Sequence, residues 1–136
     1  MEARTATIDA PKDTVGSFLA AVAAGHGIAA DLYAPDATLD ATVPNWRFVV
    51  RGAEAIAAEY GRWFVDPAAF EELTRAKLVD GEVVTYLLTW VESGVPHAAR
   101  HCHQLTLADD GRISSDVVFC GGRWSAGLLA EMAAAL

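Results

Sequence analysis

The sequence predicts an α+β fold, in which helices pack on one face of a curved antiparallel sheet that encloses an apolar pocket. Three observations predict it. Helical periodicity occurs in the first half and at the C-terminal end, the second half contains long strand patterns joined by tight turns, and 53% of the 136 residues are hydrophobic. The length suits a single domain over residues 1–136, of which residues 1–12 are predicted to be a flexible tail.

The first predicted helix has four apolar residues at helical spacing: Val15, Phe18, Leu19 and Val22. Asp13 or Thr14 can cap its start, and Gly25 ends it. A short second helix with Ile28, Leu32 and Tyr33 is expected to end before Pro35, because the residue before a proline is disfavoured in helical conformation.

Residues 38–43 alternate in polarity and predict a strand, which Pro44 and Asn45 interrupt. Residues 46–50 are predicted to form a loop with large side chains. A third helix is expected after Gly52, with an apolar face made of Ile56, Tyr60, Trp63 and Phe64.

The second half predicts a meander of four strands at residues 70–79, 82–92, 97–108 and 112–120. Asp-Gly pairs at residues 80–81 and 110–111 are typical of tight hairpin turns. A last helix is expected from Ser125 to Met132.

The charge and the cysteines limit the function classes. A net charge of -8 excludes nucleic acid and anionic membranes as partners, since phosphate binding requires clustered basic residues. No signal peptide or spanning segment is predicted, so the location is cytoplasmic and Cys102 and Cys120 are free thiols. High alanine content, with arginine at eight of the ten basic positions, is typical of a GC-rich bacterial source.

Three stretches resemble nuclear transport factor 2-like proteins of the SnoaL-like kind: residues 32–39 (LYAPDATL), 51–56 (RGAEAI) and 110–113 (DGRI). The resemblance extends over nearly the whole chain. It implies a cystatin-like cone around a pocket for a small hydrophobic molecule, and a homodimer through the outer sheet face. The family includes polyketide cyclases, isomerases, dehydratases and members without known activity, so the fold does not define the function.

Comparison with the ketosteroid isomerases of that family excludes their activity. Their catalytic base corresponds to Ala41, and their helix tyrosine corresponds to Phe18 or Ser17. His103 falls at the position of their oxyanion-hole acid. SnoaL-type cyclases have a His and an Asp on neighbouring late strands, and His103 and Asp116 resemble that pair.

Strand alternation independently places His101 and His103 on one face of their strand. If the turn pairs Leu107 with Arg112, His103 lies opposite Asp116 on the same sheet face. A histidine beside a carboxylate can transfer protons near neutral pH, and the predicted catalytic residues are therefore His103 and Asp116, supported by His101.

Other interpretations of these residues remain open. The pair can bind a ligand without catalysis, or can be a satisfied structural contact. His101, His103 and Asp116 also resemble a two-His, one-carboxylate metal site, but Leu107 stands where a cupin pattern has Glu. The sequence predicts neither a metal nor another cofactor.

The predicted pocket walls come from both halves of the chain: Phe18, Val22, Leu39, Ala41, Trp46, Phe48, Tyr60, Trp63, Phe64, Leu87, Thr89, Leu105, Val118 and Cys120. Leu87, Thr89 and Val91 are expected on the concave face. Tyr86, Leu88 and Trp90 would then form an outward apolar patch, which favours a homodimer interface.

Three functional hypotheses follow from these predictions. The first is a cofactor-independent acid–base enzyme that cyclises, isomerises or dehydrates a hydrophobic carbonyl compound. The second is a small-molecule binding protein with the same pocket. The third is a dimeric accessory module with a vestigial pocket.

Overall fold

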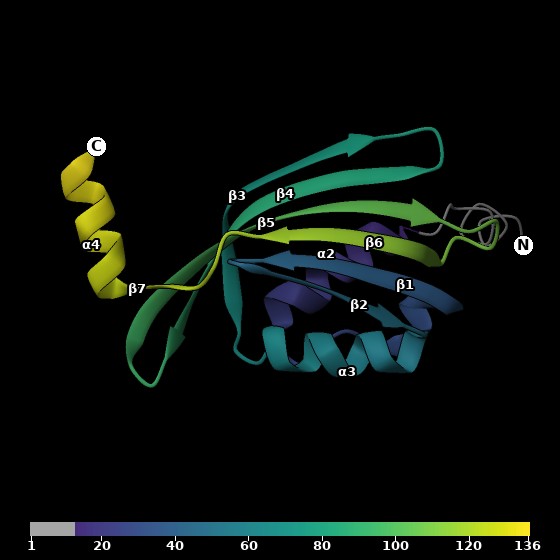
Figure 1. Ribbon diagram of the computed structural model, residues 1–136, viewed down its shortest axis with the longest axis horizontal. Coiled ribbons are helices and arrows are strands. Elements are labelled where there is room, and N and C mark those ends of the chain that lie inside the picture. The colour runs from purple at the N-terminus through teal and green to yellow at the C-terminus, as the bar shows by residue number, and fades with distance from the viewer. Residues whose placement is uncertain (1–12) are drawn as a thin grey trace, which may run out of the picture.

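A computed structural model describes residues 13–136; the predicted tail, residues 1–12, lies outside this part of the chain. Helices α2 and α3 lie against one face of a curved sheet (Figure 1). The helical segments are α2 (Thr14–Ala24), η1 (a 3₁₀ turn, Ala30–Leu32), α3 (Ala53–Trp63) and α4 (Ala126–Ala135). The strands are β1 (Tyr33–Val43), β2 (Trp46–Arg51), β3 (Ala68–Lys77), β4 (Gly81–Glu92), β5 (Val95–Leu107), β6 (Ile113–Cys120) and β7 (Trp124–Ser125). The predicted α+β class is confirmed.

The strand order is β2-β1-β6-β5-β4-β3, with β7 paired to β5. The consecutive strands from β3 to β6 form the predicted antiparallel meander. The β1–β6 pair is parallel, so the sheet is mixed and not antiparallel throughout. This pairing places the first strand beside the last long strand, and both contribute to the polar centre described below.

The core lies between the helices and the concave face of the sheet. Phe18 and Val22 of α2 are fully buried, as are Ile56 and Tyr60 of α3. Burial of one such large apolar side chain stabilises the fold by about 2 kcal/mol. The predicted wall residues Leu39, Ala41, Leu105 and Val118 lie in this core. The helical periodicity therefore identified the correct faces of α2 and α3.

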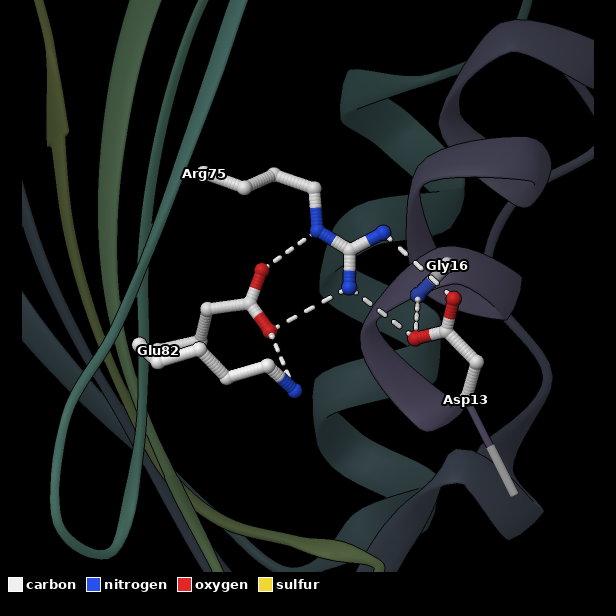
Figure 2. A network of polar contacts seen from close by, with 5 residues as sticks. Asp13, Gly16, Arg75 and Glu82 are labelled. Atoms are coloured by element: carbon white, nitrogen blue, oxygen red, sulfur yellow. Dashed lines mark hydrogen bonds and ion pairs between the residues drawn. The ribbon is translucent and has the colours of Figure 1, made fainter. Parts of the chain in front are cut away.

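A network of ion pairs ties the start of α2 to the sheet (Figure 2). Asp13 caps α2, since its Oδ1 accepts a hydrogen bond from the Gly16 N–H at 2.8 Å. Arg75 of β3 donates to this carboxylate at 3.0 Å and also to Glu82 of β4, which is 2% exposed. The two carboxylates raise the pKa of Arg75, and Arg75 lowers the pKa of Asp13. The buried carboxylate of Glu82 is therefore paired with Arg75, which also contacts the capping residue of α2.

Two predictions in the first half are wrong. The expected second helix is only the η1 turn, and Tyr33 already begins β1. The strand tolerates Pro35 because its register with β6 shifts between Tyr33 and Thr38, where proline's missing N–H breaks no regular ladder. Residues 46–50, predicted as a loop, form most of β2. Asn45, at a φ of 63°, makes the tight turn that joins β1 to β2.

The orientation predicted for β4 is also wrong. Tyr86 is fully buried and Leu88 is 4% exposed, so both face the core. Leu87 and Thr89 alternate with them and lie on the opposite, outer face. Tyr86 and Leu88 therefore do not form the outward apolar patch that was expected at a dimer interface. The homodimer stays a prediction, but these two residues do not support it.

Helix α4 stands apart from α2 and α3, beyond the end of the sheet (Figure 1). Its position agrees with the predicted last helix, but none of its residues is buried. Leu128 is 44% exposed and Met132 is 38% exposed. Among residues 13–136, no helix has both the length and the apolar character needed to cross a membrane.

Candidate functional site

The polar centre of the protein is Asp116, which is completely buried on β6. Its Oδ2 accepts hydrogen bonds from the hydroxyl of Tyr33, at 2.8 Å, and from that of Tyr60, at 2.7 Å. Its Oδ1 lies 3.0 Å from Nδ1 of His103, which is also completely buried. Three elements besides β6 thus each direct one polar group at this carboxylate. Such contacts compensate the cost of burying it.

A hydrogen-bonded chain extends from Asp116 through His103. Nε2 of His103 lies 2.9 Å from the Tyr86 hydroxyl, which lies 3.0 Å from Nδ1 of His101. The predicted face is correct, because His101, His103 and Asp116 share one side of the sheet. The predicted register is wrong by two residues. Asp116 pairs with Leu105, and His103 pairs with Val118.

One residue of this difference arises at the turn, where Leu107 pairs with Ile113 and not with Arg112, and the other arises from the register shift between Thr106 and Leu107. A displacement by two residues keeps every side chain on its original face. His103 therefore reaches Asp116 diagonally across the two strands, which is within the range of a long side chain.

A cavity of about 450 Å³ opens beside this chain of polar groups, and His101 is the member that lines it. His101 is 5% exposed, whereas His103 and Asp116 are sealed from the cavity. The apolar and aromatic side chains around the cavity are Val43, Pro44, Phe48, Trp63, Phe64, Leu88, Trp90 and Ala99. The volume suits a small molecule of one or two fused rings.

The cavity also has charged groups, at Glu59, Arg62 and Arg123. Glu59 accepts hydrogen bonds from Arg62 and from the indole N–H of Trp63. Arg123 pairs with Glu92 and stacks over the Trp90 ring, with 5.4 Å between its guanidinium carbon and the ring centroid. Each arginine is thus already neutralised by a carboxylate.

Burial controls the protonation of the titratable groups around the cavity. Burial, and to a lesser extent His103, lower the pKa of His101 from 6.5 to about 3, so His101 is neutral at physiological pH. Burial followed by the nearby Asp116 charge raises the pKa values of Tyr33, Tyr60 and Tyr86. These hydroxyls therefore keep their protons and remain available as donors.

The structure separates the predicted wall residues into three groups. Phe48, Trp63, Phe64 and Cys120 line the cavity. Phe18, Val22, Leu39, Ala41, Tyr60, Leu105 and Val118 are buried in the core and do not line it. Trp46 is 69% exposed on β2, and Leu87 and Thr89 lie on the outer face of β4. Burial raises the pKa of Cys120, so its thiol is not prepared to act as a nucleophile.

Sequence reasoning missed the roles of Tyr33 and Tyr86. Tyr33 was expected in a helix, and Tyr86 was expected to face outward. The available signal was the run Val84, Tyr86, Leu88 on alternate positions of β4, which are the side chains that face the core. A buried tyrosine in such a run needs a hydrogen-bond partner, and the histidines of the neighbouring strand are suitable partners.

Metal binding was the alternative interpretation of His101, His103 and Asp116. Within residues 13–136, no group of three or more His, Cys, Asp or Glu side chains has an arrangement that could hold a metal ion. Both ring nitrogens of His103 already contact hydrogen-bond partners, Asp116 and Tyr86. The arrangement observed is suited to proton transfer between neighbouring groups.

Comparison with known proteins identifies the fold. No family model matches the sequence, and no match was found among curated proteins. Solved structures do match. SalBIII, an epoxide hydrolase/cyclase-like enzyme of salinomycin pyran-ring formation, has 16% identity and a TM-score of 0.61 over 79% of this chain and 88% of that chain. A steroid delta-isomerase from Pseudomonas aeruginosa has 15% identity and a TM-score of 0.58 over 89% and 84%.

A third similar structure is an NTF2-like protein of unknown function from Cytophaga hutchinsonii, with 16% identity and a TM-score of 0.56 over 82% of this chain and 93% of that chain. The protein therefore has the nuclear transport factor 2-like fold that the sequence motifs predicted. The likeness is one of fold, and the similar structures include both enzymes and a protein of unknown function.

Proposed function

We propose that this protein catalyses cofactor-independent acid–base chemistry on a small hydrophobic carbonyl compound, of the isomerase, cyclase or dehydratase type. The observation that carries the proposal is the continuous chain of hydrogen bonds from the buried Asp116 to His101 at the cavity wall. A cavity with mostly apolar walls, in which His101 connects the lining to this chain of hydrogen bonds, suits a ligand with an acidic C–H bond.

The arrangement refines the roles of the three predicted catalytic residues. His101 is the group that would touch the substrate, since it lines the cavity. His103 and Asp116 are sealed behind it and would act through Tyr86 as positioning residues. Removal of a proton next to a carbonyl gives an enolate, which is the shared intermediate of many isomerisations and cyclisations.

The test uses 2-tetralone, a bicyclic ketone whose hydrogens between the aromatic ring and the carbonyl are acidic. Purified protein in D₂O should accelerate exchange of these hydrogens for deuterium, followed by proton NMR. His101→Gln should reduce the exchange rate by about 100-fold or more, the ordinary contribution of a positioned general base. His26→Gln, at an exposed loop histidine, is the matched control and should keep the wild-type rate.

A non-catalytic binding protein is the second candidate, and the apolar cavity by itself favours it equally. Calorimetric titration with 2-tetralone distinguishes the two. Binding without deuterium exchange would support the binding protein, and absence of both binding and exchange would reject the proposed substrate class. Asp116→Asn, with circular dichroism as a check of folding, should lower exchange more than it lowers binding.

A further inference from the structure

The hydrogen-bond donors and acceptors around Asp116 determine where each proton lies. The hydroxyls of Tyr33 and Tyr60 both donate to Oδ2. An ionised carboxylate only accepts hydrogen bonds, so the 3.0 Å contact between Oδ1 and Nδ1 of His103 requires a proton on Nδ1. A neutral imidazole has one N–H, and the Nε2 atom of a neutral His103 is therefore unprotonated.

The direction of the next hydrogen bond follows from that state. An unprotonated Nε2 accepts, so the Tyr86 hydroxyl, 2.9 Å away, donates its proton to His103. The raised pKa of Tyr86 agrees with a hydroxyl that keeps this proton. Since Tyr86 has one O–H, its other contact, at 3.0 Å from Nδ1 of His101, must be one in which the Tyr86 oxygen accepts.

For a resting state with Asp116 ionised and His103 neutral, the proton of a neutral His101 therefore lies on Nδ1, and its Nε2 carries a free lone pair. This Nε2 atom has no hydrogen-bond partner among the described residues, yet it is not among their buried unpartnered atoms. It is thus the ring atom of His101 that remains accessible, and the cavity is the space that His101 lines.

We propose that Tyr86 fixes the tautomer of His101, so that the cavity presents an unprotonated imidazole nitrogen and binds ligands through a hydrogen-bond donor or an acidic C–H group. The carbonyl oxygen of a ligand is then not the group that docks against His101. The binding preference stands independently, whereas the proton transfer described next rests on the proposed function.

When a ligand C–H gives its proton to Nε2 of His101, the bonding electrons remain on the ligand as an enolate. The Nδ1 proton of His101 moves to the Tyr86 oxygen, and the Tyr86 proton moves to Nε2 of His103. His101 ends neutral with the opposite tautomer, Tyr86 ends neutral, and the positive charge resides on His103. Asp116, 3.0 Å from the His103 ring, is its counter-ion.

This relay compensates for the burial of His101. The lowered pKa of His101, about 3, means that a cation held on this ring would be strongly disfavoured. A cation on His103 is stabilised by a carboxylate that two tyrosines hold in place. Tyr86 is therefore a positioning residue that lets a ring at the cavity wall act as a base without keeping the charge.

The first test is NMR correlation of the imidazole ring nitrogens and carbons in labelled protein. The wild type should show His101 with an Nδ1 proton and an unprotonated Nε2. Tyr86→Phe removes the acceptor and should shift His101 toward the Nε2–H tautomer. Tyr60→Phe, another buried tyrosine to phenylalanine change, leaves the Tyr86 contacts intact and should keep the wild-type tautomer.

A wild-type His101 with its proton on Nε2 would overturn the inference, whatever the exchange assay gives. An unchanged tautomer in Tyr86→Phe would overturn the role of Tyr86. If the tautomer is as expected and 2-tetralone neither binds nor exchanges, the proposed function fails while the tautomer assignment stands.

The second test compares 2-naphthol with 2-methoxynaphthalene, which has the same rings but no O–H group. Calorimetry should give about tenfold tighter binding of 2-naphthol, the ordinary effect of one added hydrogen bond. His101→Phe should abolish the difference. Equal affinities for the two compounds in the wild type, including no measurable binding of either, would overturn the ligand preference.

Discussion

The low pKa of His101 predicts that acid destabilises the fold, and replacement of His101 by Phe should remove this effect. In the unfolded chain the imidazole takes up a proton near pH 6.5, whereas in the folded protein it does so near pH 3. Between these values the unfolded state binds more protons, so the free energy of unfolding falls as pH falls. The slope is about 1.4 kcal/mol per pH unit, which gives a loss of about 2 kcal/mol between pH 6.5 and pH 5.

Urea unfolding, monitored by tryptophan fluorescence at several pH values from 7 to 5, measures this slope. The window stays above the range in which Asp13 and Asp40 titrate, since their pKa values are held below 3.8 by Arg75 and Arg47. His101→Phe should lose about 2 kcal/mol less than the wild type between pH 6.5 and 5, and His26→Gln should behave as the wild type. Equal losses in His101→Phe and the wild type would refute the reasoning.

Three further predictions concern stability. Arg75→Met leaves the buried Glu82 without its main partner and should lower the free energy of unfolding by about 2 kcal/mol in chemical denaturation. Arg100→Met removes an exposed pair with Glu72 and should lower it by less than about 1 kcal/mol. Similar losses in the two variants would contradict the role of burial. Gly25 has a φ of 74°, and the Cβ added by Gly25→Ala would lie 2.1 Å from the backbone of Asp66. The melting temperature of Gly25→Ala should therefore fall more than that of Gly94→Ala, in which the added Cβ meets open space. Deletion of residues 126–136 removes no buried side chain and should change the free energy of unfolding by less than about 0.5 kcal/mol from the full-length value. A larger loss would contradict this expectation.

The sequence predicted most of the fold because its local signals agree with the final structure. The Asp-Gly turns and the β-branched runs define β4, β5 and β6 to within two residues. The predictions of secondary structure failed where contacts between distant segments override the local sequence pattern. Residues 46–50 form β2 because β1 offers a pairing edge, and their mixture of polar and apolar side chains suits an exposed edge strand.

The candidate site was predicted in part. Alternation alone correctly placed His101, His103 and Asp116 on one sheet face. It could not distinguish which of the three lines a cavity, because that depends on the helix side chains packed against each one, such as Phe18 of α2 against His103. The outward assignment of Tyr86 followed from choosing the wrong phase for β4, although Val84, Tyr86 and Leu88 form the more apolar of its two alternating sets and the other set contains Thr85 and Thr89.

The parallel β1–β6 pair has a consequence for the way the protein is made. Tyr33 and Asp116, which meet across this pair, are separated by 83 positions in the chain. Contacts of such long range form late and slow folding, because the loop must close before the contact contributes. A ribosome-bound chain that has not yet released β6 therefore lacks the carboxylate on which the whole proton network depends. Any ligand that requires this network can therefore bind only after β6 has been synthesised and has paired with β1 and β5.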